Sequence, residues 1–227
     1  MVTSLRGAAL LLLLAATFCP AQDGKYAVKA AKSDVPREVD ESIRELMGGE
    51  SITFLDSGKP VAEIWLRGEI PVDATPAQIK NGVTYREIKQ TELVGVVKFH
   101  QKYHDYRKQT VKAGVYVLRN ILQPQDGDHA GKSPFLEFFV ATAAAADKKP
   151  GTIGDIKTLM EMSQKSIDTG HPAVFMLFPA KPGTAAKVEA RPNMHWVVTT
   201  QREVAVKGEK TGAFLGISVT LVGHADE

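Results

Sequence analysis

Cysteine is almost absent from this chain, and the only one, Cys19, lies near its start. It follows an apolar segment with the features of a secretory signal peptide: Arg6 gives a positive start, and Leu10–Leu14 is a run of leucines. Cys19-Pro20-Ala21 offers small residues for cleavage, which we expect near Ala21. The mature chain would then have neither disulfides nor thiol chemistry, and the protein is expected to be secreted or periplasmic.

Long apolar runs are also lacking. The leader is shorter than the roughly 20 residues of a membrane-spanning helix, and no later segment reaches that length, so we expect no transmembrane segment. Lipid attachment to Cys19, as in bacterial lipoproteins, is an alternative to cleavage near Ala21. Bulky Phe18 before the cysteine and Pro20 after it argue against this alternative.

A charge excess of one sign is missing as well. Lys and Arg number 28 against 26 Asp and Glu, so the chain has no electrostatic footprint for nucleic acid, and we expect no nucleic-acid partner. The sequence contains no GxSxG nucleophile motif, no glycine-rich phosphate loop and no dinucleotide fingerprint. These absences favour a non-catalytic protein over an enzyme.

What the chain does contain is a series of short segments rich in β-branched and aromatic residues. Glycine and proline separate them, and strands do not alternate with helices along the chain. The pattern predicts a mainly β fold, a jelly-roll-like β-sandwich with a short N-terminal helix and one inserted helix. We expect a signal peptide over residues 1–21, a flexible lead over 22–33 and a single β-sandwich domain over 34–227.

The two helices have recognisable ends. The short one is expected within Asp34–Met47, with Ser33 or Asp34 as its cap. The inserted helix is expected to begin at Thr152, which forms a capping-box pattern with Asp155, and to stop at Gly170. Its apolar stripe is expected to face the core and consists of Ile156, Leu159, Met160 and Ile167.

Polar residues gather around the expected strand ends of Val94–Val140. Within this segment, the loop Gln123–Pro134 is longer than a tight hairpin needs, and long loops on rigid strands often carry function. We therefore expect a ligand site near this loop. Its candidate ligand-binding residues are Asp105, Arg107, Arg119, Asp126, Asp128 and His129.

Two interpretations of the arginines stay open. Arg119 lies between apolar residues of an expected central strand, where a buried guanidinium would need a carboxylate partner. The expected partner is Asp105, Asp126 or Glu137. Alternatively, Arg107 or Arg119 binds the carboxylate or sulfate of a ligand.

A divalent metal is a further possibility. His100 and His104 share a face in either a helix or a strand, and with His129 they could form a metal site. The glutamate of the HExxH motif is missing, however. Asp126-Gly127-Asp128 resembles a calcium loop only in part, because Ala130 stands where an oxygen ligand is needed, and an aspartate-rich turn that binds its own backbone amides is the alternative.

Three short phrases resemble an uncharacterised family of secreted bacterial β-sandwich proteins. They are VKAGVYVLR at Val111–Arg119, IWLRGEIP at Ile64–Pro71 and QPQDGDHAG at Gln123–Gly131. The resemblance implies an exported β-sandwich domain, and it assigns no activity and no catalytic residue.

These observations predict an exported, non-catalytic ligand-binding or accessory domain. Its partner would be a small molecule, a glycan or an envelope protein. Two alternatives stay open: a metal-dependent enzyme that uses the histidine and aspartate residues, and a purely structural envelope protein.

Overall fold

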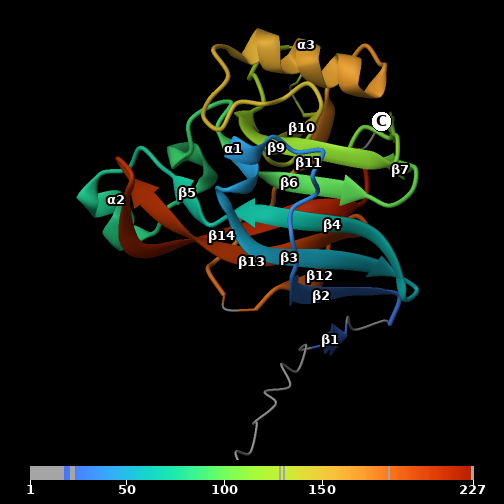
Figure 1. Cartoon of the computed structure of the whole chain (residues 1–227), viewed down its shortest axis with the longest axis horizontal. Helices are drawn as coiled ribbons and strands as arrows, with labels where there is room; N and C mark the ends of the chain where they lie inside the picture. Colours follow the sequence, from blue (N-terminus) through green and yellow to red (C-terminus); the bar gives the residue numbers. More distant parts are fainter. Residues whose placement is uncertain (1–17, 21–23, 128, 130, 184, 226–227) are drawn as a thin grey trace, which may run out of the picture.

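Antiparallel strands are the main elements of the molecule, with short helices between them (Figure 1). The computed structural model describes residues 18–20, 24–127, 129, 131–183 and 185–225. The predicted mainly β fold is confirmed. Most of the expected signal peptide, with its cleavage position near Ala21, lies outside the described residues.

Eight of the described strands form the larger sheet, in the order β1-β2-β3-β4-β6-β9-β10-β11. Each neighbouring pair is antiparallel. The Greek-key crossings of a jelly roll are not among the pairings of these described strands, which follow their order in the chain. The strands are β1 (Phe18–Pro20), β2 (Tyr26–Lys32), β3 (Met47–Asp56), β4 (Lys59–Arg67), β6 (Leu93–Phe99), β9 (Gly114–Leu122), β10 (Glu137–Ala143) and β11 (Ala173–Met176).

A second sheet is built on the two longest strands, β13 (His195–Val206) and β14 (Glu209–Val222). The antiparallel β12 (Lys187–Arg191) and the parallel β5 (Glu69–Pro71) also pair with β13. Side chains of both sheets share one apolar core, for example Phe99 and Phe175 of the larger sheet with Leu215 of the smaller. Residues of both sheets therefore belong to the same apolar core.

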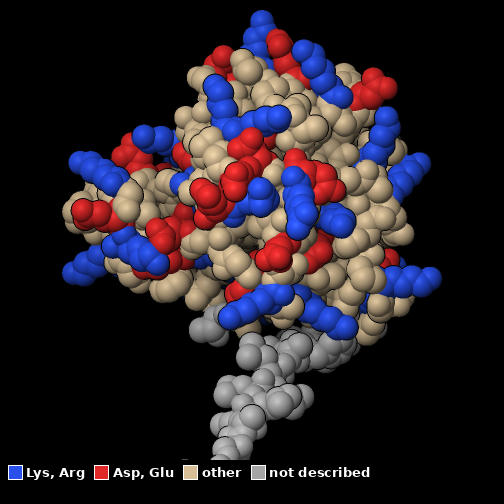
Figure 2. Space-filling model, viewed as in Figure 1, with Lys and Arg blue, Asp and Glu red and all other residues tan. Residues whose placement is uncertain are grey.

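Short elements connect the strands of the two sheets. Strands β7 (Tyr103–His104) and β8 (Thr110–Val111) form a small ladder, and α2 (Pro76–Asn81) and the 3-10 helix η1 (Tyr85–Glu87) follow β5. No helix of the described residues has the length and apolar character to cross a membrane. Basic and acidic side chains are interspersed over the face seen in Figure 2, as the balanced composition predicts.

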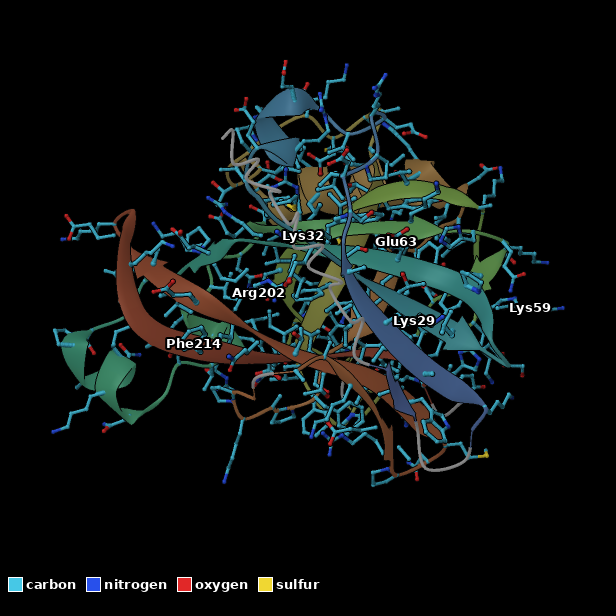
Figure 3. The ribbon with its side chains drawn as sticks, turned by 60° about the horizontal axis from the view of Figure 1, so that its bottom comes forward. Lys29, Lys32, Lys59, Glu63, Arg202 and Phe214 are labelled. Carbon is cyan, nitrogen blue, oxygen red and sulfur yellow. The ribbon has the colours of Figure 1, made fainter. Side chains whose placement is uncertain are left out.

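The segment expected to be a flexible lead forms β2 instead. Tyr26 and Val28 are buried, whereas Lys29 and Lys32 are exposed along the same strand (Figure 3). From Tyr26 to Lys29, inward and outward side chains alternate with the period of two that a half-buried strand requires, and the exposed Lys32 ends the strand. The lysines of this segment hide that short pattern, because Lys29 is at an outward position and Lys32 lies where the alternation has ended.

The N-terminal helix is shorter than expected. Helix α1 covers only Glu41–Arg44, and its cap is Asp40, whose side chain accepts a hydrogen bond from the Ser42 N–H at 3.1 Å. The predicted caps Ser33 and Asp34 lie upstream of it. Only one turn is helical, and it buries Ile43.

The inserted helix α3 (Ile156–Ile167) packs on the outer face of the larger sheet, against β10 and β11 (Figure 1). Its cap is Asp155, which accepts from the Thr158 N–H at 2.8 Å, and not the expected Thr152. Ser163 binds the helix to both strands: its hydroxyl donates to the Ala141 carbonyl at 2.6 Å and accepts from the Ala173 N–H at 2.9 Å. These bonds fix α3 relative to the sheet.

A buried ion pair holds the chain segment that leads from β10 into α3. The Arg119 guanidinium on β9 forms two parallel bonds to Asp147, both at 2.7 Å, and both side chains are fully buried. Its other N–H groups donate to the carbonyl groups of Thr91 at 2.9 Å and of Lys149 and Gly151 at 2.6 Å. All five donors of the guanidinium are therefore used.

The expected ion pair of Arg119 is confirmed, but the expected partners are wrong. Neither Asp105, Asp126 nor Glu137 pairs with it, because the chain after β10 turns back and brings Asp147 over the sheet. With every donor used inside the protein, Arg119 offers nothing to a ligand. Its contribution is to the fold.

We predict that Arg119→Met lowers the free energy of unfolding by about 3–5 kcal/mol, because it leaves the Asp147 carboxylate buried without a cation. Urea denaturation measures the loss. The matched control is Lys210→Met, which removes the exposed ion pairs to Glu69 at 2.8 Å and to Glu203 at 3.6 Å and is expected to move the denaturation midpoint far less. Equal losses in the two variants would contradict the importance given to the buried pair.

Candidate functional site

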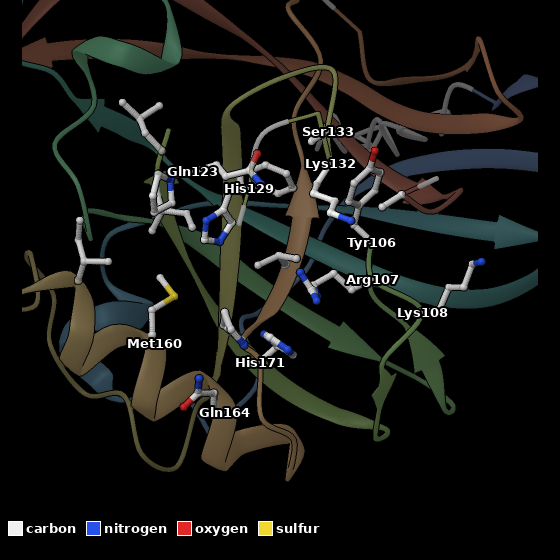
Figure 4. A pocket seen from close by; sticks show the side chains of 18 residues that line it. Tyr106, Arg107, Lys108, Gln123, His129, Lys132, Ser133, Met160, Gln164 and His171 are labelled. Atoms are coloured by element: carbon white, nitrogen blue, oxygen red, sulfur yellow. The ribbon is translucent and has the colours of Figure 1, made fainter. Parts of the chain in front are cut away.

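A pocket of about 470 Å³ lies between α3 and the loop that joins β9 to β10 (Figure 4). Its volume is in the range of small-molecule binding sites. Residues from β9, β10, β11, α3 and the segment between β7 and β8 line it, together with the loop itself. The structure thus places a cavity beside the loop Gln123–Pro134 that the sequence singled out.

Apolar side chains form the larger part of the pocket lining. They include Ile121 on β9, Phe138 on β10 and Val174 on β11, and α3 adds Ile156 and Met160. Aliphatic, aromatic and thioether groups thus meet from four different elements. A ligand in this pocket would have to cover apolar surface to bind well.

Two residues of the expected core stripe of α3 are pocket residues. Leu159 and Ile167 are buried as expected, but Ile156 is 39% exposed and Met160 is only partly buried. The buried positions Leu159, Ser163 and Ile167 are four residues apart and define the face toward the sheet. Ile156 and Met160 lie at the border of that face, where the sheet no longer covers them and the pocket begins.

The polar part of the lining is basic. Arg107, Lys108 and Lys132 contribute cations, His129 and His171 add imidazoles, and no Asp or Glu occurs among the described residues of the lining. In Figure 4 the side chains of Arg107, His129 and His171 point toward the middle of the pocket, whereas Lys108 points away. Within the described part of the chain, no carboxylate pairs with Arg107 or Lys132.

One lining residue has an unused hydrogen-bonding group. The side-chain oxygen of Gln123 is buried and has no partner among the described residues. Buried polar atoms are rarely left without a partner in folded proteins, and such an atom at a pocket wall can be satisfied by a bound molecule. The amide therefore offers a neutral polar contact at the pocket wall.

The candidate residues of the loop have different positions. Asp126 accepts hydrogen bonds from the His129 backbone N–H at 3.2 Å and pairs with the His129 ring at 2.6 Å. This is the self-satisfied aspartate turn that the sequence left open as an alternative to a calcium loop. Asp128 lies outside the described residues. Of these loop residues, His129 therefore reaches the pocket, and Asp126 supports it.

The expected metal set is not brought together. The His100 ring lies 3.8 Å from Glu63 on β4, and His104 is exposed on β7. Nowhere in the described residues are three or more His, Cys, Asp or Glu side chains grouped so that they could hold a metal ion. The alternative of a metal-dependent enzyme relied on one set of histidines. That set, His100, His104 and His129, does not form a metal site in this structure.

Asp105 lies beneath the pocket and does not line it. The residue is 1% exposed, and its carboxylate accepts from the N–H groups of Arg107 at 3.0 Å, Gln109 at 2.8 Å and Val174 at 3.1 Å. The Gln109 side chain adds a fourth bond at 2.8 Å. Burial raises the pKa of this carboxyl group, and the hydrogen bonds partly offset that effect. The expectation that Asp105 binds ligand is thus corrected: it fastens the Arg107 backbone to β11.

We predict that Asp105→Ala lowers the free energy of unfolding by at least about 1–3 kcal/mol, the cost of one buried donor left without an acceptor. Four donors lose their acceptor in this variant. His104→Ala, one residue away and exposed, serves as the control and should stay within about 0.5 kcal/mol of the wild type in the same urea denaturation. A neutral Asp105→Ala would contradict the anchoring role.

The pocket therefore combines an apolar wall with cations and one unpaired amide oxygen. Its serine, Ser133, donates to the Phe135 carbonyl at 2.8 Å, and among the described residues no base is hydrogen-bonded to it that would make it a nucleophile. The arrangement is suited to binding. No protein-family model, curated protein or solved structure matches this chain.

Proposed function

We propose that this protein is an exported, non-catalytic binding protein whose pocket beside Gln123–Pro134 takes a small, mainly apolar molecule. The observation that carries the proposal is the pocket itself, a cavity of about 470 Å³ with apolar walls from four elements. Such a concave apolar site with a few polar groups is the usual form of a small-molecule site.

The α3 wall favours binding over a purely structural role. Apolar Ile156 is 39% exposed at this wall, and Met160 lies partly buried next to the cavity. Apolar surface in a concave site is stabilised when a ligand removes it from water. A purely structural protein would gain nothing from leaving this surface uncovered.

Two further parts of the proposal rest on other observations. The N-terminal leader with its leucine run supports export. The common core of the two sheets supports a sandwich as the form of the single domain.

A neutral fluorescent probe tests whether the pocket binds apolar molecules. We expect N-phenyl-1-naphthylamine to bind the mature protein saturably and Met160→Trp to weaken it at least about tenfold, a loss of about 1.4 kcal/mol, because the larger side chain fills the cavity. Fluorescence titration gives both affinities.

Met194→Trp is the matched control. Met194 is 86% exposed and is not one of the pocket residues, so this variant should bind the probe like the wild type. A wild-type protein that does not bind the probe, or equal losses in the two tryptophan variants, would contradict binding at this pocket.

A further inference from the structure

The charge of the pocket identifies the class of its ligand. We propose that the pocket binds a monocarboxylate with a compact apolar body, whose carboxylate is held by Arg107 and Lys132. This inference rests on the proposed binding function and adds the chemistry of the ligand to it.

The excess of positive charge is local to the pocket. Over the whole chain, 28 basic residues nearly balance 26 acidic ones. The described pocket lining instead contains Arg107, Lys108 and Lys132 and no acidic residue. The His129 ring has a carboxylate partner from outside the lining, because its Nδ1 atom lies 2.6 Å from an Asp126 carboxylate oxygen. The uncompensated charge therefore lies with Arg107 and Lys132, for which no carboxylate partner occurs among the described residues.

The backbone of Arg107 is held in place before any ligand arrives. Its backbone N–H is bonded to the buried Asp105 carboxylate at 3.0 Å, and the neighbouring Tyr106 N–H donates to the Val174 carbonyl on β11 at 2.9 Å. Its side chain points into the pocket (Figure 4). A guanidinium presents a planar fork of donors that matches the two oxygens of a carboxylate. Beside an apolar wall this attraction is stronger than in open water.

Arg107 and Lys132 reach the pocket from a different side than α3 does. Met160 on α3 occupies one side in Figure 4, and Arg107 and Lys132 extend from another. A ligand that satisfies both sides needs an apolar body and one anionic end. A bare inorganic anion such as sulfate would leave the apolar side of a cavity of about 470 Å³ uncovered. The arrangement therefore favours an amphipathic acid over an inorganic anion.

Aliphatic and aromatic acids share this chemistry, and a competition experiment distinguishes them. The competitors are decanoate and 2-naphthoate, and each is compared with its primary alcohol, 1-decanol or 2-naphthalenemethanol. The measurement is the concentration at which each competitor displaces N-phenyl-1-naphthylamine from the mature protein. We expect at least one acid to displace the probe at a concentration about tenfold or more below that of its alcohol. A tenfold ratio is at the low end of what one hydrogen bond to a charged group contributes to affinity. This preference should shrink as salt screens the charges.

Variants assign the preference to the pocket. Arg107→Gln, and separately Lys132→Gln, should reduce the ratio of alcohol to acid concentrations toward one. The ratio compares two competitors in the same variant, so a change in probe affinity does not affect it, and urea denaturation shows that each variant folds. Lys102→Gln removes the same charge from an exposed position outside the pocket lining and should keep the wild-type ratio.

Each outcome decides one of the two proposals. If the probe binds but acids and alcohols compete equally, or if Lys102→Gln lowers the ratio as much as Arg107→Gln, the carboxylate inference is overturned and the apolar binding function stands. Displacement of the probe by sulfate at the concentration of the acids would also overturn it. If the probe does not bind at all, both proposals fail.

Discussion

The buried ion pair between Arg119 and Asp147 determines where one wall of the pocket lies. Moving two charges out of water is unfavourable unless their attraction and further hydrogen bonds compensate for the lost hydration. Here the Arg119 guanidinium donates through all five N–H groups, three of them to carbonyl groups of Thr91, Lys149 and Gly151. The chain between β10 and α3 is thereby tied to the sheet, and the position of α3 follows from it.

A second buried carboxylate fixes the opposite wall. Asp105 gathers four N–H donors and holds the segment that carries Arg107 against β11. Both anchors are saturated with hydrogen bonds, as stable buried polar groups must be. The pocket between them differs, since the Gln123 side-chain oxygen has no partner among the described residues. Rigid walls with unsatisfied groups at the cavity are what a preorganised binding site requires.

The sequence predicted those parts of the fold that depend on local pattern. The β3–β4 hairpin turns at Ser57-Gly58, where both residues have positive φ, and glycine was one of the two residues expected to separate the strands. Strand β9 lies within Val94–Val140, where strands were expected. Strand β2 was not predicted because only its first half alternates and its lysines, Lys29 and Lys32, are exposed. The apolar run of β9 also showed that Arg119 must be paired.

Long-range contacts could not be predicted in the same way. Asp147 lies in a short alanine- and lysine-rich segment, and only the fold shows that this segment returns to β9. Similarly, an apolar stripe indicates which helix face avoids water but not where the sheet beneath it ends, so Ile156 and Met160 were assigned to the core. The long loop with its glycines and prolines was the feature of the sequence that pointed to the pocket.

The most direct test observes the apolar wall itself. In protein labelled with ¹³C at the methionine methyl groups, titration with decanoate should shift the Met160 resonance saturably, because Met160 lines the pocket. The resonance of Met194, which is 86% exposed and outside the lining, should stay in place. A Met160 resonance that does not move, or one that moves no more than that of Met194, would contradict binding of an apolar acid between α3 and the loop.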